Sequence, residues 1–335
     1  MSLNLTLKYN KGGINMISSQ PLQTIPIQKN KPSRIKIFLR TLLNQRVLVL
    51  MILPAFLIIF IFNYIPMYGV LIAFKNYKVA YGIWDSPWVG LKYFEAFFSN
   101  PLAVRTVINT LILGVYSFLW TFPAPIILSL LINEISNMKF KKLVQTISYL
   151  PYFISIVILV GMMKNFSAMD GGLFNRIVIF FGGKPIQFFA ESSWFRTLYI
   201  GSSIWQGIGW GTIIYLAALA GIDLALYEAA TMDGANRFQR MWHVTFPALL
   251  PTICILMILS VGNILGSDFQ KVLLMYTPKT YEVSDVISTY VFREGIQGAK
   301  FSYTTAVGLF TSVISFILLF TSNKVSKLIG ETSLW

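Results

Sequence analysis

The feature that most constrains this chain is the spacing of its charged side chains. Six intervals of more than 20 residues contain no Asp, Glu, Lys or Arg, and each is mostly apolar: 47–74, 106–133, 143–163, 197–222, 241–267 and 301–323. About 20 apolar residues are needed to cross a bilayer as a helix. Because the bilayer core holds no water, the backbone must satisfy its own hydrogen bonds, as helices do and open strands do not. The sequence therefore predicts an all-α, polytopic membrane protein with six transmembrane helices.

The basic residues indicate how these spans are oriented. Six spans place both termini on one side, together with the loops 134–142 and 223–240. Fifteen of the 27 Lys and Arg residues fall on that side, where the segments between spans are short. Because Lys and Arg in short loops stay in the cytoplasm, we expect a multi-pass protein of the cell membrane with both termini cytoplasmic. The net charge of +14 is then explained by topology and contact with anionic lipid. It is spread over loops, so nucleic acid is not an expected partner.

The N-terminal region is expected to lie outside the six-span body. Residues 1–33 carry scattered Gly, Pro, Gln and Asn, which predicts a disordered cytoplasmic tail. Segment 34–46 is basic and amphipathic, so we expect it to lie along the inner membrane interface. The six-span domain is expected to cover residues 47–330.

The sequence lacks the patterns of an enzyme or a self-sufficient pump. It contains no G-x-x-x-x-G-K-[ST] phosphate loop, no H-E-x-x-H and no paired cysteines, and it has one Cys and one His. We therefore expect no catalytic residues, no metal site and no cofactor bound by this chain. Ion-coupled transporters place charged residues within their spans, whereas these six intervals have none. Energy for uphill transport is therefore expected to come from another protein.

A polar segment at 223–247 separates two of the apolar runs. Asp223 and Asn236 suit the N-caps of two short helices, and Gly234 suits the left-handed residue that ends the first helix. The second helix is expected to hold four residues on its apolar side: Phe238, Met241, Trp242 and Thr245. The residues predict a helix–turn–helix elbow on the cytoplasmic side. By themselves they leave open whether this elbow docks on a partner or only connects two spans.

The elbow also carries a recognisable spacing. Glu228-Ala229-Ala230 is followed after three residues by Gly234, and after nine more by V-T-F-P, which ends at Pro247. This resembles the EAA loop of binding-protein-dependent ABC importer permeases, E-A-A-x3-G-x9-I-x-L-P, with Val and Phe in place of Ile and Leu. The stretches "WVGLKYFEAFF", "NTLILG", "YLPYFIS" and "DFQKVLLMYTP" resemble the carbohydrate-importer branch. The first span is similar to permeases for oligosaccharides and polysaccharide fragments.

The resemblance implies a type I ABC importer permease fold and ATP-driven import of a carbohydrate, expected to be an oligosaccharide, by alternating access. It implies that the loop 223–247 contains a coupling helix that docks on a separate ATPase. The residues expected to take part are Glu228, Ala229, Ala230, Asp233, Gly234, Arg237 and Pro247. The implied partners are a second, similar permease, expected to be a different chain, two ATPase subunits that bind ATP and Mg, and an extracellular solute-binding protein.

Polar and aromatic residues in the fourth and fifth spans are candidates for the substrate path. Aromatic faces stack on the C–H surfaces of sugars, while polar side chains bond the hydroxyls. The candidates are Trp205, Gln206, Trp210, Asn263 and Asp268. Alternatives stay open, because Trp also forms belts at membrane interfaces and Asn also joins helices. For the whole chain, the alternatives are a permease for another solute, a secondary transporter, and a membrane enzyme or assembly factor without transport.

Overall fold

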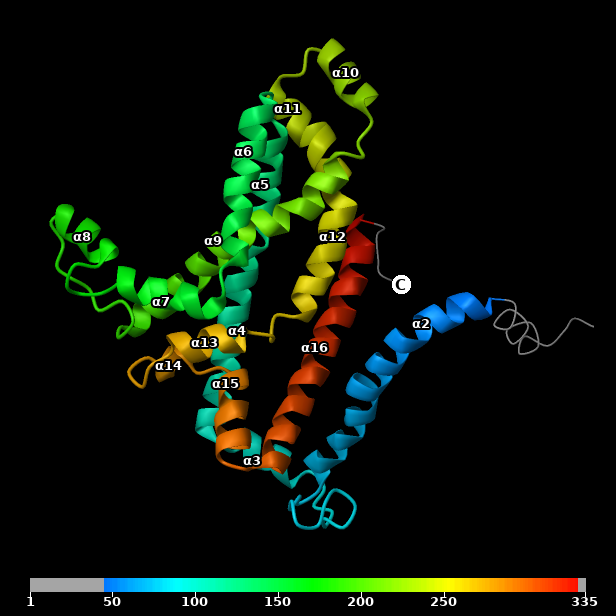
Figure 1. Cartoon of the computed structure of the whole chain (residues 1–335), viewed down its shortest axis with the longest axis vertical. Coiled ribbons are helices and arrows are strands. Elements are labelled where there is room, and N and C mark those ends of the chain that lie inside the picture. Colours follow the sequence, from blue (N-terminus) through cyan, green and yellow to red (C-terminus); the bar gives the residue numbers. More distant parts are fainter. Residues whose placement is uncertain (1–44, 331–335) are drawn as a thin grey trace, which may run out of the picture. The chain divides into compact units, whose positions relative to one another are not determined.

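The computed structural model describes residues 45–330, with side chains up to residue 327 (Figure 1). The expected tail 1–33 and nearly all of the expected interfacial segment 34–46 lie outside the described residues. The chain divides into two compact units, residues 1–65 and 66–335.

The described part of the first unit is one apolar helix. It comprises α2 (Arg46–Ile59) and the π-helical turn η1 (Phe60–Tyr64), and none of its residues is buried. Phe60 stacks on Phe56 and on Tyr64 with ring centroids 6.0 Å apart. The helical run continues into η2 (Ile65–Phe74), so the first candidate span covers Arg46–Phe74. An unburied helix of this composition is suited to a lipid environment.

The second unit contains the other helices. In chain order they are α3 (Lys92–Phe98), α4 (Pro101–Thr121), α5 (Pro123–Asn133), α6 (Met138–Tyr149), η3 (Leu150–Phe153), α7 (Ile156–Phe166), α8 (Leu173–Phe180), α9 (Ser192–Leu219), α10 (Leu224–Met232), α11 (Arg237–Arg240), η4 (Met241–Thr245), α12 (Phe246–Gly262), α13 (Phe269–Met275), α14 (Tyr281–Ser284), α15 (Ile287–Val291), η5 (Phe292–Gln297) and α16 (Phe301–Gly330). Across residues 45–330 extended pairing is limited to two isolated bridges, so the all-α prediction is confirmed.

The long helices agree with the predicted spans. Four runs are long and apolar enough to cross a membrane: Arg46–Phe74, Pro101–Asn133, Arg237–Gly262 and Phe301–Lys327. Two bent pairs are further candidates, Met138–Phe153 with Ile156–Phe166 at 98° and Ser192–Leu219 with Leu224–Met232 at 77°. In the second pair the predicted span 197–222 falls on Ser192–Leu219, and Leu224–Met232 belongs to the elbow. Counting each pair as one span gives six. The bend in the third span follows Pro151, which cannot donate a helical hydrogen bond.

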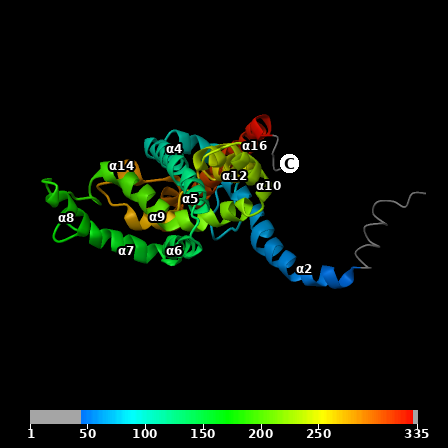
Figure 2. The same cartoon turned by 90° about the horizontal axis from the view of Figure 1, so that it is seen from above.

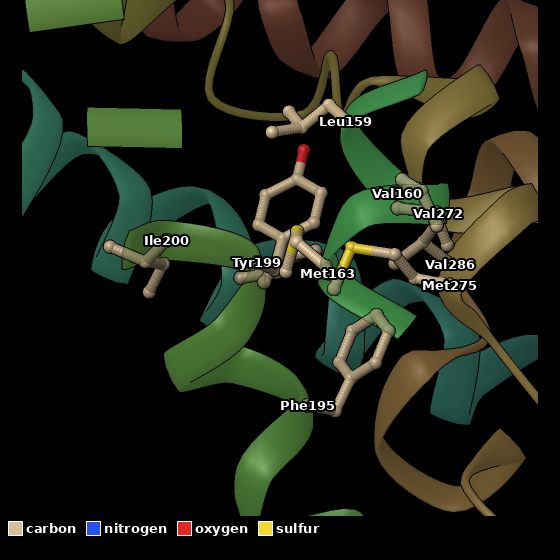
Figure 3. Close-up of a cluster of buried hydrophobic side chains, with 10 residues drawn as sticks. Leu159, Val160, Met163, Phe195, Tyr199, Ile200, Val272, Met275 and Val286 are labelled. Atoms are coloured by element: carbon tan, nitrogen blue, oxygen red, sulfur yellow. The ribbon is translucent and has the colours of Figure 1, made fainter. Parts of the chain in front are cut away.

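The helices of the second unit pack closely at small residues. A β-carbon on Gly209 of α9 would lie 1.9 Å from the carbonyl oxygen of Ser148, so only glycine allows α9 to approach α6 this closely. Side chains from α7, α9 and α13 meet in a buried cluster that includes Met163, Tyr199 and Val272 (Figure 3). Figures 1 and 2 show α7 and α8 projecting to one side of α5 and α12. The 223–247 elbow lies at the end of this helix bundle opposite α3 and α15 (Figure 1).

Candidate functional site

The first half of the elbow is a short helix with a defined cap at each end. Asp223 caps α10, since its carboxylate accepts a bond from the backbone N–H of Ala225 at 2.9 Å. At the other end, Gly234 N–H donates to the carbonyl of Thr231 at 3.0 Å, and Ala235 N–H donates to that of Ala230 at 2.9 Å. Gly234 has φ +81°, and these two bonds form a Schellman motif around it. The predicted N-cap and left-handed glycine are confirmed.

The second half begins with the predicted cap but buries fewer residues than expected. Asn236 and Gln239 form a capping box, with bonds of 2.9 and 2.8 Å to each other's backbone N–H groups. Thr245 is buried and Met241 packs against the core, as predicted. The prediction was wrong for Phe238 and Trp242, which are 67% and 54% exposed.

The physical reason for this difference is local geometry. The helix α11 is a single turn, and η4 then continues as a π-helix, so the regular helical spacing assumed from the sequence does not hold. Trp242 stacks on Phe246 instead, with centroids 5.0 Å apart and the ring planes 4° from parallel. Pro247 lies in the first turn of α12, where its missing N–H is not needed.

Side-chain bonds hold the two halves of the elbow together. The hydroxyl groups of Tyr227 and Thr245 lie 3.0 Å apart, which ties α10 to η4. Arg240 donates to the hydroxyl of Thr231 at 2.7 Å, which ties α11 to α10. The sequence did not single out these contacts. Because the bonds cross the turn, the elbow is suited to move as one body.

The outer face of the elbow is exposed and mixes charged with apolar side chains. Of the predicted coupling residues, Glu228, Ala229, Asp233, Gly234 and Arg237 are exposed and Ala230 is half-buried. Within the described residues, no ion pair involves any of them. Three apolar side chains of the elbow are also exposed, with Leu224 at 73%, Met232 at 88% and Phe238 at 67%. Exposed apolar groups ringed by polar ones are typical of a protein-binding surface.

A cavity of about 390 Å³ lies where α4, α5, α9 and α12 meet, and we call it the central cavity. Its polar lining comprises Ser117, Thr121, Tyr199, Tyr215, Ser260, Asn263 and Ser267. Asn263 is the one residue among the five path candidates that lines it. Its lining combines hydroxyl, amide and aromatic groups, which can bond a polar ligand while covering its apolar surface.

Two of the other candidates brace the break in the third span. Gln206 donates from Nε2 to the carbonyl oxygen of Ile154 at 2.8 Å, at the junction of η3 and α7. Trp210 stacks on Tyr152 with centroids 4.4 Å apart and ring planes 4° from parallel. Trp205 lies elsewhere, in an apolar groove formed with α7 and α8. The structure therefore does not bring the five candidates into one site.

Asp268 caps α13, and it lies beside a lysine that sequence reasoning missed. Its carboxylate accepts from Lys271 N–H at 3.0 Å, and its own N–H donates to the hydroxyl of Tyr199 at 3.2 Å. The Lys271 ammonium is buried and donates to the Tyr199 carbonyl at 3.0 Å and to Ser203 Oγ at 2.6 Å. Burial lowers the pKa of Lys271 to about 8, against a smaller opposing effect of Asp268. The signal in the sequence was a lysine between apolar residues in "DFQKVLL".

An ion pair between buried Asp285 and half-buried Arg293, also missed, lies on the connection between α14 and α16. The carboxylate of Asp285 accepts two bonds from the Arg293 guanidinium, at 3.1 and 2.6 Å, and a third from Thr289 at 2.9 Å. The bond to Asp285 is the main cause that raises the pKa of Arg293. Asn109 of α4 donates to the carbonyl oxygens of Glu282 and Asp285. This network holds the connection against α4.

Comparison with known proteins gives a consistent result. The profile of the family described as "Binding-protein-dependent transport system inner membrane component" matches residues 96–329. The chain is 43% identical over 314 residues to the polygalacturonan/rhamnogalacturonan transport system permease protein YteP of Bacillus subtilis, covering 94% of this chain and 97% of the relative. It is 42% identical over 318 residues to Protein LplB of the same organism, covering 94% and 100%.

A solved structure has the same fold. It is the bacterial alginate ABC transporter in complex with an alginate pentasaccharide-bound periplasmic protein. One of its chains is 39% identical to this chain and superposes with a TM-score of 0.82, over 88% of this chain and 99% of that one.

Proposed function

The chain belongs to the family of binding-protein-dependent transport system inner membrane components, and on this premise we propose that it is the permease subunit of an ATP-driven importer that carries an oligosaccharide across the cell membrane. The observation that carries the proposal is the elbow. Its E-A-A-x3-G spacing forms a capped and braced turn whose outer face carries unpaired charges and exposed apolar groups. The chain itself needs no catalytic group in this role, because ATP and Mg are bound by the partner ATPase.

The choice of an oligosaccharide follows from the relatives. YteP is named for polygalacturonan and rhamnogalacturonan transport, and the alginate transporter was solved with a pentasaccharide-bound periplasmic protein. The central cavity supports the same choice, because its hydroxyl and amide groups suit a polyhydroxylated ligand. We place Asn263 on the substrate path, and we assign Gln206 and Trp210 to bracing the third span.

The elbow is the proposed contact with the ATPase. Glu228, Asp233 and Arg237 would pair with charges of the ATPase, while Met232 and Phe238 are covered on docking. Since α9 leads into α10 and η4 leads into α12, a movement of the braced elbow is transmitted to both spans. The elbow and both termini are then cytoplasmic, a second permease completes the path, and a solute-binding protein delivers the sugar from outside.

Uptake by cells that encode this chain tests the substrate class. Removing the gene should abolish uptake of at least one labelled oligosaccharide from a panel of neutral and acidic trisaccharides, and the restored gene should return it. Uptake of phosphate, polyamines and peptides should not change. If cells without the gene lose uptake of phosphate, polyamines or peptides but take up every oligosaccharide normally, the proposal is overturned.

A further inference from the structure

A second groove, of about 480 Å³, lies between α4 and α9 and shares no lining residue with the central cavity. Two aromatic side chains of α4, Tyr116 and Trp120, line one wall, and Arg196 lines the other wall with Thr197 and Ile204 of α9. We call this space the Arg196 groove. Arg196 lies near the start of α9, at the opposite end of that helix from the elbow.

Arg196 lies at the edge of the fourth span and is half-buried, and part of its side chain lacks a hydrogen-bond acceptor within the described residues. Its Nε is buried and makes no hydrogen bond within the described part of the chain. The ion pairs found among residues 45–327 are Asp285–Arg293 and Glu294–Lys300, so Arg196 has no carboxylate of its own there. Ionisable groups within spans normally pair with another group or face a cavity that carries a function. The missing acceptor is therefore expected to come from outside the described chain.

The shape and chemistry of the groove indicate what that acceptor is. A guanidinium group offers parallel N–H donors that fit the two oxygens of a carboxylate. Tyr116 and Trp120 are 47% and 61% exposed, so their flat faces are open to a ligand. Aromatic rings combine a large apolar face with a polar edge, as a sugar ring also does. A neutral sugar would leave the arginine unpaired, whereas a sugar acid would satisfy it.

Arg196 is the one charged residue among the described residues that line the groove. Residues seven apart lie on nearly the same face of a helix, so Arg196, Ser203 and Trp210 share one face of α9. Ser203 accepts a bond from the Lys271 ammonium at 2.6 Å. The Lys271 ammonium is itself buried and does not line the Arg196 groove, so Arg196 supplies the charge that this groove offers to a ligand.

We propose that the Arg196 groove is a subsite for the carboxylate of an acidic sugar, so that the cargo is an oligosaccharide containing uronate residues. The inference rests on the proposed transport function and adds the charge of its substrate. A different source of the same chemistry would be a carboxylate of the partner permease, which would make Arg196 part of the interface between the two permeases.

The test compares two trisaccharides that differ only in charge. Trigalacturonate and its carboxyl-reduced, neutral counterpart are each titrated into the purified permease–ATPase complex in nanodiscs. Binding is followed by saturation-transfer NMR, without the binding protein, whose own selectivity would otherwise contribute. We expect wild type to bind trigalacturonate at least tenfold more tightly than the neutral trisaccharide. Arg196→Gln should remove this preference, and Arg196→Lys, which keeps the charge, should retain part of it.

Two further variants separate a subsite from a general effect. Arg105→Gln is the matched control, because Arg105 of α4 also has a buried, unpartnered Nε but does not line the groove. It should keep the full preference. Trp120→Leu should weaken the binding of both trisaccharides, because it removes the aromatic wall and leaves the charge.

Three results would overturn the inference. They are equal binding of the two trisaccharides by wild type, an unchanged preference in Arg196→Gln, and loss of the partner permease from the purified Arg196→Gln complex. If any of these results is obtained but the cells still import a neutral oligosaccharide, the inference about Arg196 fails and the proposed transport function is retained. If the cells import no saccharide of any charge, the proposed function fails together with the inference.

Discussion

The backbone N–H of Ala235 donates to the carbonyl oxygen of Ala230 at 2.9 Å, and Gly234 stands between them with φ +81°. This bond accounts for part of the E-A-A-x3-G spacing, because a Schellman motif places its left-handed residue four positions after the acceptor. The alanine before the gap and the glycine after it are thus two parts of one helix cap. The cap sets the angle at which α10 turns into α11.

Gly234→Val tests this cap. The left-handed conformation costs an L-residue roughly 1–2 kcal/mol, and more when the side chain is β-branched. The added β-carbon would meet no atom within 4 Å, so the effect is conformational and not a clash. We expect normal membrane insertion but a several-fold loss of uptake per ATP hydrolysed. Gly234→Asn should remain close to wild type, since Asn tolerates this conformation. If Gly234→Val and wild type take up the same amount of substrate per ATP hydrolysed, the cap has no role in coupling ATP hydrolysis to transport.

Glu228→Lys tests docking on the ATPase. Glu228 is exposed and has no ion-pair partner in the described chain, so a basic group of the ATPase is its proposed partner. Leaving one member of an interfacial charge pair unpaired costs roughly 2–5 kcal/mol. The ATPase should therefore be lost during purification at moderate salt. Glu95→Lys is the matched control, because Glu95 is an exposed acid on α3 at the other end of the bundle (Figure 1). If both variants retain the ATPase equally, Glu228 is not part of the contact.

Gln206→Leu distinguishes a bracing residue from a substrate ligand. The variant leaves the carbonyl of Ile154 without its donor at the break between η3 and α7. An unpaired buried polar group costs about 1–3 kcal/mol. We expect a lower melting temperature of the purified complex, with the KM for uptake unchanged. A large rise in KM at unchanged melting temperature would instead assign Gln206 to the substrate path.

Lys271 should give the protein a measurable dependence of stability on pH. Its pKa in the fold, about 8, lies below the ordinary value of 10.5, so burial disfavours the charged form. Below about pH 8 Lys271 is charged in both the folded and the unfolded state, so burial of its charge lowers the free energy of unfolding by the full amount. As pH rises from about 8 toward 10.5 the folded state releases its proton before the unfolded state does, so the free energy of unfolding rises, by at most about 3 kcal/mol.

The measurement is the difference in unfolding between pH 7.5 and pH 10 for wild type and variants. Lys271→Met should lose the stabilisation that develops with rising pH, whatever its stability at neutral pH. Lys279→Met, which removes an exposed lysine nearby in the sequence, should keep the wild-type dependence. Identical pH profiles for wild type and Lys271→Met would show that Lys271 titrates normally.

The features that could be predicted from sequence are those decided by neighbouring residues. The caps at Asp223 and Asn236 and the left-handed Gly234 depend on a few adjacent positions, and all three are confirmed. The membrane spans could be predicted for the same reason, because each one depends on the length and hydropathy of a single continuous run of residues.

The remaining features depend on residues far apart in the chain. Lys271 finds its partner Tyr199 at a separation of 72 residues, and Gln206 finds Ile154 at a separation of 52. No periodic pattern encodes such pairs. The wrong prediction for Phe238 has a different cause, because the single turn of α11 and the π-helical turn η4 do not keep the regular α-helical spacing assumed from the sequence.

The most direct test of the account is uptake into proteoliposomes that contain this chain, a second permease and the ATPase, with loaded binding protein outside. We expect a labelled oligosaccharide to accumulate only when hydrolysable ATP is present on the ATPase side. Accumulation should stop with a non-hydrolysable ATP analogue or without the ATPase, and it should continue when ion gradients are collapsed. Accumulation that needs no ATPase and disappears with the ion gradient would contradict the account.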